Sequence, residues 1–116
     1  QTVGPLLEHH PDFPERTNVE FVSFLAERDA QGSPLLYQRT WERGSGETLA
    51  CGSGACAVAV AAHLGGHTPV QQTIRLRGGD LLLAYDPAAQ RSGQAAVFMS
   101  GPGRLVFQGT YRSSRP

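Results

Sequence analysis

Apolar residues follow two different patterns along the chain. Most of them lie in short segments rich in β-branched and aromatic residues, bounded by glycine, proline or polar clusters, and such segments predict strands. The predicted strands span residues 19–27, 35–41, 72–76, 81–85, 95–100 and 105–111. The first two are separated by Gln31-Gly32-Ser33-Pro34, a turn sequence that predicts a hairpin. A short helix at residues 3–10 is predicted before them, ending at Pro11.

The second pattern is a run of small apolar residues, which predicts a helix at residues 53–64. Its central part, 55–62, has no polar face, and a helix that is apolar all round is expected to be buried on every side. Its small side chains let neighbouring strands approach closely. We therefore predict an α+β fold in which a curved, mostly antiparallel sheet is wrapped around one central apolar helix. Residues 112–116 are expected to form a frayed tail.

The length and charge of the chain argue against several classes of protein. With 116 residues it is expected to form one domain. Ten basic residues balance ten acidic ones and no block of lysine or arginine occurs, so nucleic acid is not an expected partner. The longest apolar run is too short to span a bilayer, so a membrane is not an expected partner either.

The two cysteines, Cys51 and Cys56, lie at the start and inside the predicted helix. A disulfide between them would strain the backbone, so we expect free thiols and a reduced, cytoplasmic location. The four histidines lie far upstream of these thiols or at the other end of the helix, and they suggest no tetrahedral ligand set. No metal is therefore expected.

Cys51 is the strongest candidate for chemistry, because it ends a glycine-rich loop at the start of the apolar helix. The first N–H groups of a helix have no acceptor within it and lie at the positive end of the macrodipole, so they bind anions. The same position makes a thiol a better acid or base. A carboxylate-bearing substrate and a reactive cysteine are expected there together. The alternative is that Cys51 is only a small buried residue, which is our interpretation of Cys56.

Three segments resemble one known family. Residues 42–55, Glu-Arg-Gly-Ser-Gly-Glu-Thr-Leu-Ala-Cys-Gly-Ser-Gly-Ala, resemble the second-cysteine signature of the diaminopimelate epimerases. Residues 13–22, Phe-Pro-Glu-Arg-Thr-Asn-Val-Glu-Phe-Val, are similar to another C-terminal motif of that family. Residues 101–109, Gly-Pro-Gly-Arg-Leu-Val-Phe-Gln-Gly, fit its last strand. The resemblance covers nearly the whole chain, with the segments in the right order and spacing.

The resemblance implies an isomerase with two lobes of like topology and the amino-acid substrate between them. It implies no pyridoxal cofactor and no metal. One cysteine in each lobe faces the substrate α-carbon, one removing a proton as thiolate and the other returning one as thiol. The product, meso-diaminopimelate, serves lysine and peptidoglycan synthesis. Residues 1–116 resemble the C-terminal lobe, so the missing N-terminal lobe is an expected partner, a homodimer is a family-level expectation, and the chain alone is expected to be inactive.

The family also implies roles for six residues. Cys51 matches its second acid/base cysteine, while Gly52 and Ser53 supply N–H groups for the substrate α-carboxylate. The family more often has threonine at position 53, so Ser53 keeps a hydroxyl at the expected helix cap.

Three further residues match the part of the site that holds the far end of the substrate. Asn18 matches a binding amide. Arg43 would bind the distal carboxylate, either bidentately or through its backbone, and Glu42 would meet an ammonium group or help to tune the thiols. From the residues alone, Glu42 and Arg43 are expected to be a solvated pair at a strand end, and Asn18 could cap a turn before the strand.

Two other functions stay open at this point. One is a cofactor-independent racemase of another amino acid, of the histidine or proline type. The other is an isolated lobe that binds a ligand without turning it over, since the chain has one plausible acid/base thiol.

Overall fold

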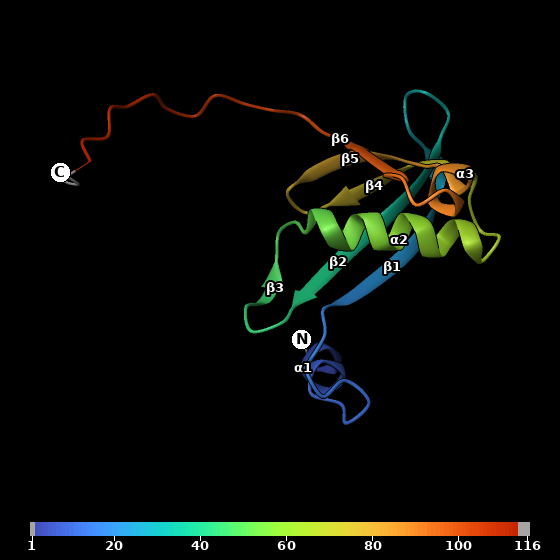
Figure 1. The fold of residues 1–116 in the computed structure, drawn as a ribbon, viewed down its shortest axis with the longest axis horizontal. Helices are drawn as coiled ribbons and strands as arrows, with labels where there is room; N and C mark the ends of the chain where they lie inside the picture. Colours follow the sequence, from blue (N-terminus) through green and yellow to red (C-terminus); the bar gives the residue numbers. More distant parts are fainter. Residues whose placement is uncertain (1, 114–116) are drawn as a thin grey trace.

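The structure, a computed structural model, describes residues 2–113. Within that range a mixed six-stranded sheet packs against helix α2 (Gly52–Leu64), with two shorter helices, α1 (Val3–Glu8) and α3 (Pro87–Arg91), beside it (Figure 1). The α+β class is therefore confirmed. The strands are β1 (Val19–Arg28), β2 (Pro34–Glu42), β3 (Gly46–Thr48), β4 (Gln71–Leu76), β5 (Gly79–Tyr85) and β6 (Val97–Ser100).

The strands lie in the order β1-β2-β4-β5-β6, and β3 pairs with the end of β2. All neighbours are antiparallel except β2 and β4, which run parallel with Leu36 opposite Ile74. Parallel neighbours need a long crossover, and α2 supplies it here. The crossover places α2 against one face of the sheet, with its start close to β3 (Figure 1).

The core lies between α2 and the sheet. Leu36, Ile74 and Leu83 come from three different strands, and Ala55 and Ala59 face them from the helix; all five are fully buried. Alanines at these positions allow the helix axis to approach the sheet closely, because no larger side chain separates them. The predicted role of the small helical residues is confirmed on this face.

The other face of α2 departs from the prediction. Ala57 and Ala61 are exposed, and Leu64 has 69% of its surface exposed, so the expectation that the helix is buried on every side is wrong for this chain. The described strands cover one side of the helix, and β1 forms the edge of the sheet there. An apolar helix can be covered fully only if further chain closes over that side.

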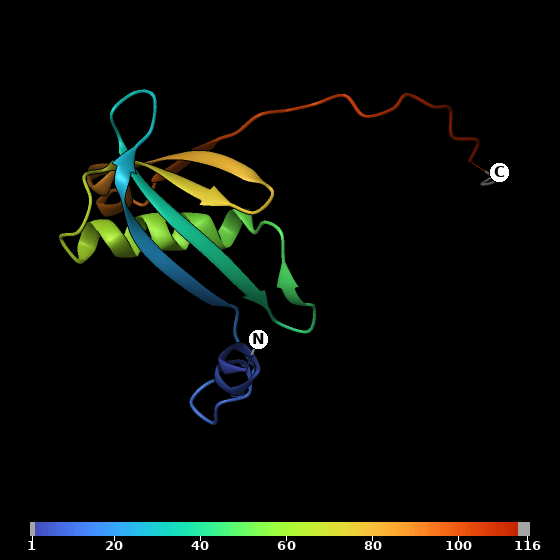
Figure 2. The ribbon, with the colours of Figure 1, turned by 180° about the vertical axis from the view of Figure 1, so that it is seen from behind.

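The predicted strand at residues 105–111 is also wrong for the described structure. From residue 101 to 113 the chain has no regular secondary structure and runs away from the body (Figures 1 and 2). Leu105, Val106, Phe107 and Tyr111 are 83–91% exposed. A strand needs a neighbour to take its backbone hydrogen bonds, and this segment lies beside none. Residues 114–116 of the predicted tail lie outside the described residues.

Candidate functional site

Cys51 is the N-cap of α2. Its backbone is extended, and its Sγ accepts a hydrogen bond from the N–H of Gly54 at 3.3 Å. The hydroxyl of Ser53 lies 3.5 Å from the same sulfur. The helix thus begins at Gly52, one residue earlier than predicted, and the cap is the thiol of Cys51 rather than the hydroxyl of Ser53. Cys51 has 8% of its surface exposed.

The first turn of α2 is glycine-rich because other elements press against it. A Cβ on Gly54 would lie 2.1 Å from Oε1 of Glu20 on β1, and a Cβ on Gly52 would lie 3.2 Å from Cε of Met99 on β6. Contacts below 3.0 Å require a neighbour to move, so Gly54 leaves the room that Glu20 occupies. The two strands at the edges of the sheet, β1 and β6, thus lie against the first turn of the helix that Cys51 caps.

Glu20 was missed by the sequence analysis. Its Oε2 accepts hydrogen bonds from Nε2 of Gln38 at 2.8 Å and from Oγ1 of Thr40 at 2.5 Å. Its Oε1 is buried and has no hydrogen-bond partner among the described residues. The partly alternating pattern of β1 did not predict these contacts. Glu20 occupies an ordinary position of the strand, on the same face as Val22.

The predicted residues Asn18, Glu42 and Arg43 lie where β1 begins and β2 ends. Oδ1 of Asn18 accepts a hydrogen bond from the backbone N–H of Arg43 at 2.9 Å, and the guanidinium of Arg43 donates to the carbonyl of Glu15 at 3.0 Å. Glu42 accepts a hydrogen bond from Oγ1 of Thr48 at 2.6 Å. The strand pairing brings these residues together, because Val19 and Trp41 face each other in the ladder.

The structure therefore brings the predicted residues together as two groups. The helix-start group contains Cys51, Gly52 and Ser53, and the strand-end group contains Asn18, Glu42 and Arg43. Within residues 2–113 no hydrogen bond joins the two groups. The chain connects them through β3, since Thr48, which holds Glu42, precedes Cys51 by three residues.

Cys56 differs from Cys51 in its surroundings. Both thiols are free, and Cys56 packs against the core from the second turn of α2. Burial raises the pKa of the Cys56 thiol, and the nearby Cys51 adds to this rise. A thiol with a raised pKa is less often ionised to the reactive thiolate near neutral pH, which fits a packing role for Cys56.

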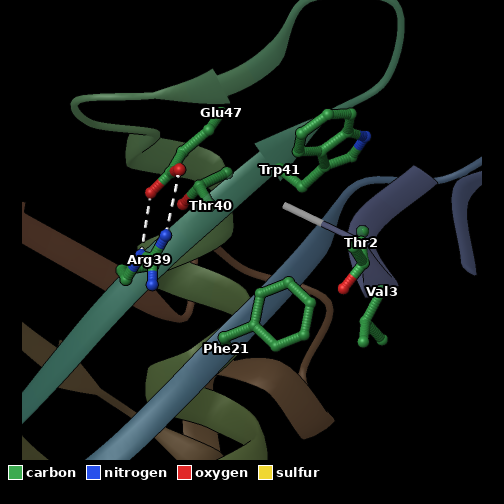
Figure 3. Close-up of a pocket in the computed structure, with 8 residues that line it drawn as sticks. Thr2, Val3, Phe21, Arg39, Thr40, Trp41 and Glu47 are labelled. Atoms are coloured by element: carbon green, nitrogen blue, oxygen red, sulfur yellow. Dashed lines mark hydrogen bonds and ion pairs between the residues drawn. The ribbon is translucent and has the colours of Figure 1, made fainter.

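A cavity of about 220 Å³ lies between α1 and the first two strands. Figure 3 shows Phe21 and Trp41 at this cavity, with Arg39 and Glu47 paired beside them. No predicted site residue lines it. Among the described residues, no group of three or more histidine, cysteine or acidic side chains could hold a metal ion, and no helix is long and apolar enough to cross a membrane.

Comparison with known proteins agrees with the sequence motifs. The family model described as diaminopimelate epimerase matches residues 1–106. The diaminopimelate epimerase of Leptospira biflexa is 53% identical over 107 residues, which are 92% of this chain and 34% of that protein. Those of a Synechococcus species and Pelotomaculum thermopropionicum are 53% and 46% identical, with 93% and 96% of this chain covered and 34% and 35% of the relatives. The chain thus spans about a third of the length of these relatives, and it belongs to the diaminopimelate epimerase family.

Proposed function

We propose that this chain supplies one lobe and one acid/base cysteine of an isomerase that converts LL-diaminopimelate to meso-diaminopimelate without a cofactor. The observation that carries the proposal is the place of Cys51 at the first turn of α2, within a motif of the matched family. The finer architecture, a sheet wrapped around the helix as in an epimerase lobe, belongs to the same proposal. It would be completed by chain that covers the exposed face of α2.

The start of α2 suits the proposed chemistry. An amino-acid α-proton is very weakly acidic, so the carbanion formed on its removal needs electrostatic stabilisation. The N–H groups of Gly52 and Ser53 belong to the first helical turn, where no acceptor exists within the helix. They can bind the substrate α-carboxylate as charge develops beside it. Donors that are already oriented stabilise such charge without reorganisation, often by several kcal/mol.

Inversion at the α-carbon needs two acid/base groups on opposite faces, because the proton returns to the face opposite the one it left. A free cysteine has a pKa of about 8.5, so both thiol and thiolate are accessible near neutral pH. Cys51 supplies one of these groups, and a reduced cytoplasmic setting would keep it as a thiol. The second group would come from the N-terminal lobe, so turnover by this chain alone is not expected.

The strand-end group would hold the far end of the substrate. The guanidinium of Arg43 offers paired donors to a distal carboxylate. Glu42 would face the distal ammonium group. The carbonyl of Asn18 is engaged by the backbone of Arg43, which leaves its amide NH₂ as a donor. A substrate with an amino-carboxylate at both ends matches these groups better than histidine or proline does.

The test is complementation with the N-terminal part of the Leptospira biflexa relative, expressed separately. In D₂O the mixture is expected to incorporate deuterium at the α-carbon of LL-diaminopimelate, measured by mass spectrometry. Cys51→Ala is expected to lower the rate about 10²–10⁴-fold, the usual worth of an acid/base group. Cys56→Ala, the matched control, is expected to leave the rate of deuterium incorporation unchanged.

Three outcomes would contradict the proposal. Exchange of L-histidine or L-proline in place of diaminopimelate would indicate another racemase. Equal rates for Cys51→Ala and the unmodified chain would remove Cys51 from the chemistry. A folded mixture that binds substrate but exchanges no deuterium would indicate a binding lobe.

A further inference from the structure

Glu8, the last residue of α1, carries a buried carboxylate outside both groups of the site. The residue has 3% of its surface exposed. Its Oε2 accepts a hydrogen bond from Nε1 of Trp41 at 2.7 Å, and its Oε1 accepts one from the backbone N–H of Gly44 at 2.9 Å. The guanidinium of Arg16 lies 3.5 Å from the same Oε1. One side chain from the N-terminal helix thus bridges both sides of the turn that follows β2.

The two bonds of Glu8 enclose Glu42 and Arg43, which lie between Trp41 and Gly44. We propose that Glu8 is a positioning residue, which fixes the turn at residues 43–45 and thereby presents Glu42 and Arg43 to the substrate. This inference rests on the proposed function for the roles of those two residues. Glu8 itself does not touch the substrate in this proposal.

Consecutive amides of the turn are held by different segments. The N–H of Arg43 donates to Asn18, and the N–H of Gly44 donates to Glu8. Within the turn, the N–H of Ser45 donates to the carbonyl of Glu42 at 3.1 Å. Gly44 has a φ of +77°, a conformation that other residues rarely adopt. Hydrogen bonds to a charged acceptor are the stronger ones, so loss of Glu8 should loosen the turn more than loss of a neutral acceptor.

The position of α1 depends on the same contact. A Cβ on Gly4 would lie 2.7 Å from the ring of Trp41, so the helix lies directly against the indole. Helix α1 therefore fixes Trp41 in two ways: Gly4 packs against its ring, and Glu8 accepts its indole hydrogen bond. Since Trp41 immediately precedes Glu42, an error in its placement would pass to the predicted binding residues.

The charge state of Glu8 follows from these neighbours. The hydrogen bond from Trp41, and next that from Gly44, lower the pKa of the Glu8 carboxyl; burial opposes them, and His9 and Arg16 assist them. A carboxyl whose pKa is lowered by folding stabilises the fold above its ordinary pKa. That contribution is lost as the pH falls through the lowered value. The turn should therefore be ordered at neutral pH and loosen in acid.

The test uses nuclear magnetic resonance on the 116-residue chain. Trp41 is its single tryptophan, so one indole N–H signal reports the contact. Glu8→Gln is expected to shift that signal and the Gly44 amide, and to speed exchange of the Gly44 amide about tenfold. In acid the unmodified indole signal should titrate, whereas that of Glu8→Gln should not. The control is Glu27→Gln, at a side chain that is 75% exposed on β1.

The link to substrate binding is tested by titration with meso-diaminopimelate. Glu8→Gln is expected to weaken binding about tenfold in the unmodified background and to have no further effect in Arg43→Ala. If Glu8→Gln binds as the unmodified chain does, while Arg43→Ala binds less, the positioning role is overturned.

The two proposals fail in different ways. If substrate binding does not depend on Arg43, the proposed function is overturned. The NMR signals of the Arg43 and Gly44 amides would still decide the role of Glu8. Unchanged amides in Glu8→Gln would overturn that role whatever the substrate result. If Glu8→Gln does not fold, Glu8→Asp keeps the charge with one methylene fewer. It should lose one of the two bonds and shift one of the two signals; unchanged signals would overturn the role.

Discussion

The two groups of the candidate site are held in place by different means. The helix-start group depends mainly on the helix backbone and its packing. The N–H of Ala55 donates to the carbonyl of Cys51 at 2.9 Å, and Gly54 leaves room for Glu20 of β1, while the Cys51 thiol adds one cap hydrogen bond. The strand-end group depends on side chains, because Asn18 and Glu8 accept the turn amides. The first should respond to changes of volume in the core, and the second to changes of charge.

The difference also concerns exposure. Ala55 lies one turn from the start of α2 and is fully buried in the core, so the helix start is tied to the most rigid part of the molecule. Asn18 and Arg43 are exposed at the surface. In the proposed function, rigid placement would suit a group that removes a proton at one carbon, and an exposed turn would suit groups that admit the far end of a substrate.

The largest effect is expected from the core beneath α2. Leu36→Ala removes a fully buried side chain and leaves a cavity, so the free energy of unfolding should fall by about 2–5 kcal/mol in urea titration. Leu64→Ala removes the same atoms from a residue that is 69% exposed, and it should change stability by at most about 0.5 kcal/mol. Equal losses in the two variants would mean that the exposed face of α2 is covered in solution.

Acid should affect the strand-end group next. The pKa values of Glu8 and Asp29 are lowered by folding, through hydrogen bonds from Trp41 and Thr73 respectively. Both carboxylates therefore stabilise the fold above their ordinary pKa, and this contribution is lost as the pH falls through the lowered values. As the pH falls from 7 to about 3, the protection factor of the Gly44 amide (its exchange rate relative to an unstructured amide at the same pH) should fall before that of Ala55 does. The same acid-dependent loss of protection at Gly44 in Glu8→Gln would contradict the assignment.

The sequence predicted the regular elements of the core well. The predicted helix at 53–64 is observed at Gly52–Leu64, and the predicted strand at 72–76 at Gln71–Leu76. These elements carry strong local patterns. Helix α3 was missed although its signal was present: the carboxylate of Asp86 caps it and Pro87 follows at the first position. Strand β3, of three residues, is too short for a pattern and exists because β2 pairs with it.

The site was predictable only in part. Cys51 and Arg43 are candidates because motifs contain them, whereas the contacts of Glu8 and Glu20 join distant segments of the chain. Glu8 lies 33 and 36 residues from its two partners, and such separation leaves no periodic signal. The strand predicted at 105–111 is the reverse case. Its sequence pattern is present, but the neighbouring strand that would pair with it is not beside it. The sequence records what a segment can form, and its surroundings decide whether it does.

The smallest effect is expected from the cap itself, and it separates structure from chemistry at Cys51. Cys51→Ser keeps an acceptor for the N–H of Gly54, so stability should change by at most about 0.5 kcal/mol. Cys51→Ala leaves that N–H without its acceptor and should cost about 0.5–1 kcal/mol, measured in urea against the Cys56→Ala control. Both Cys51 variants should lose deuterium exchange in the complemented enzyme. If Cys51→Ser retained exchange, the hydroxyl would be performing the proton transfer assigned to sulfur. If Cys51→Ala destabilised the chain as much as Leu36→Ala, the helix start would depend on this one side chain, and the contrast between the two groups would not hold.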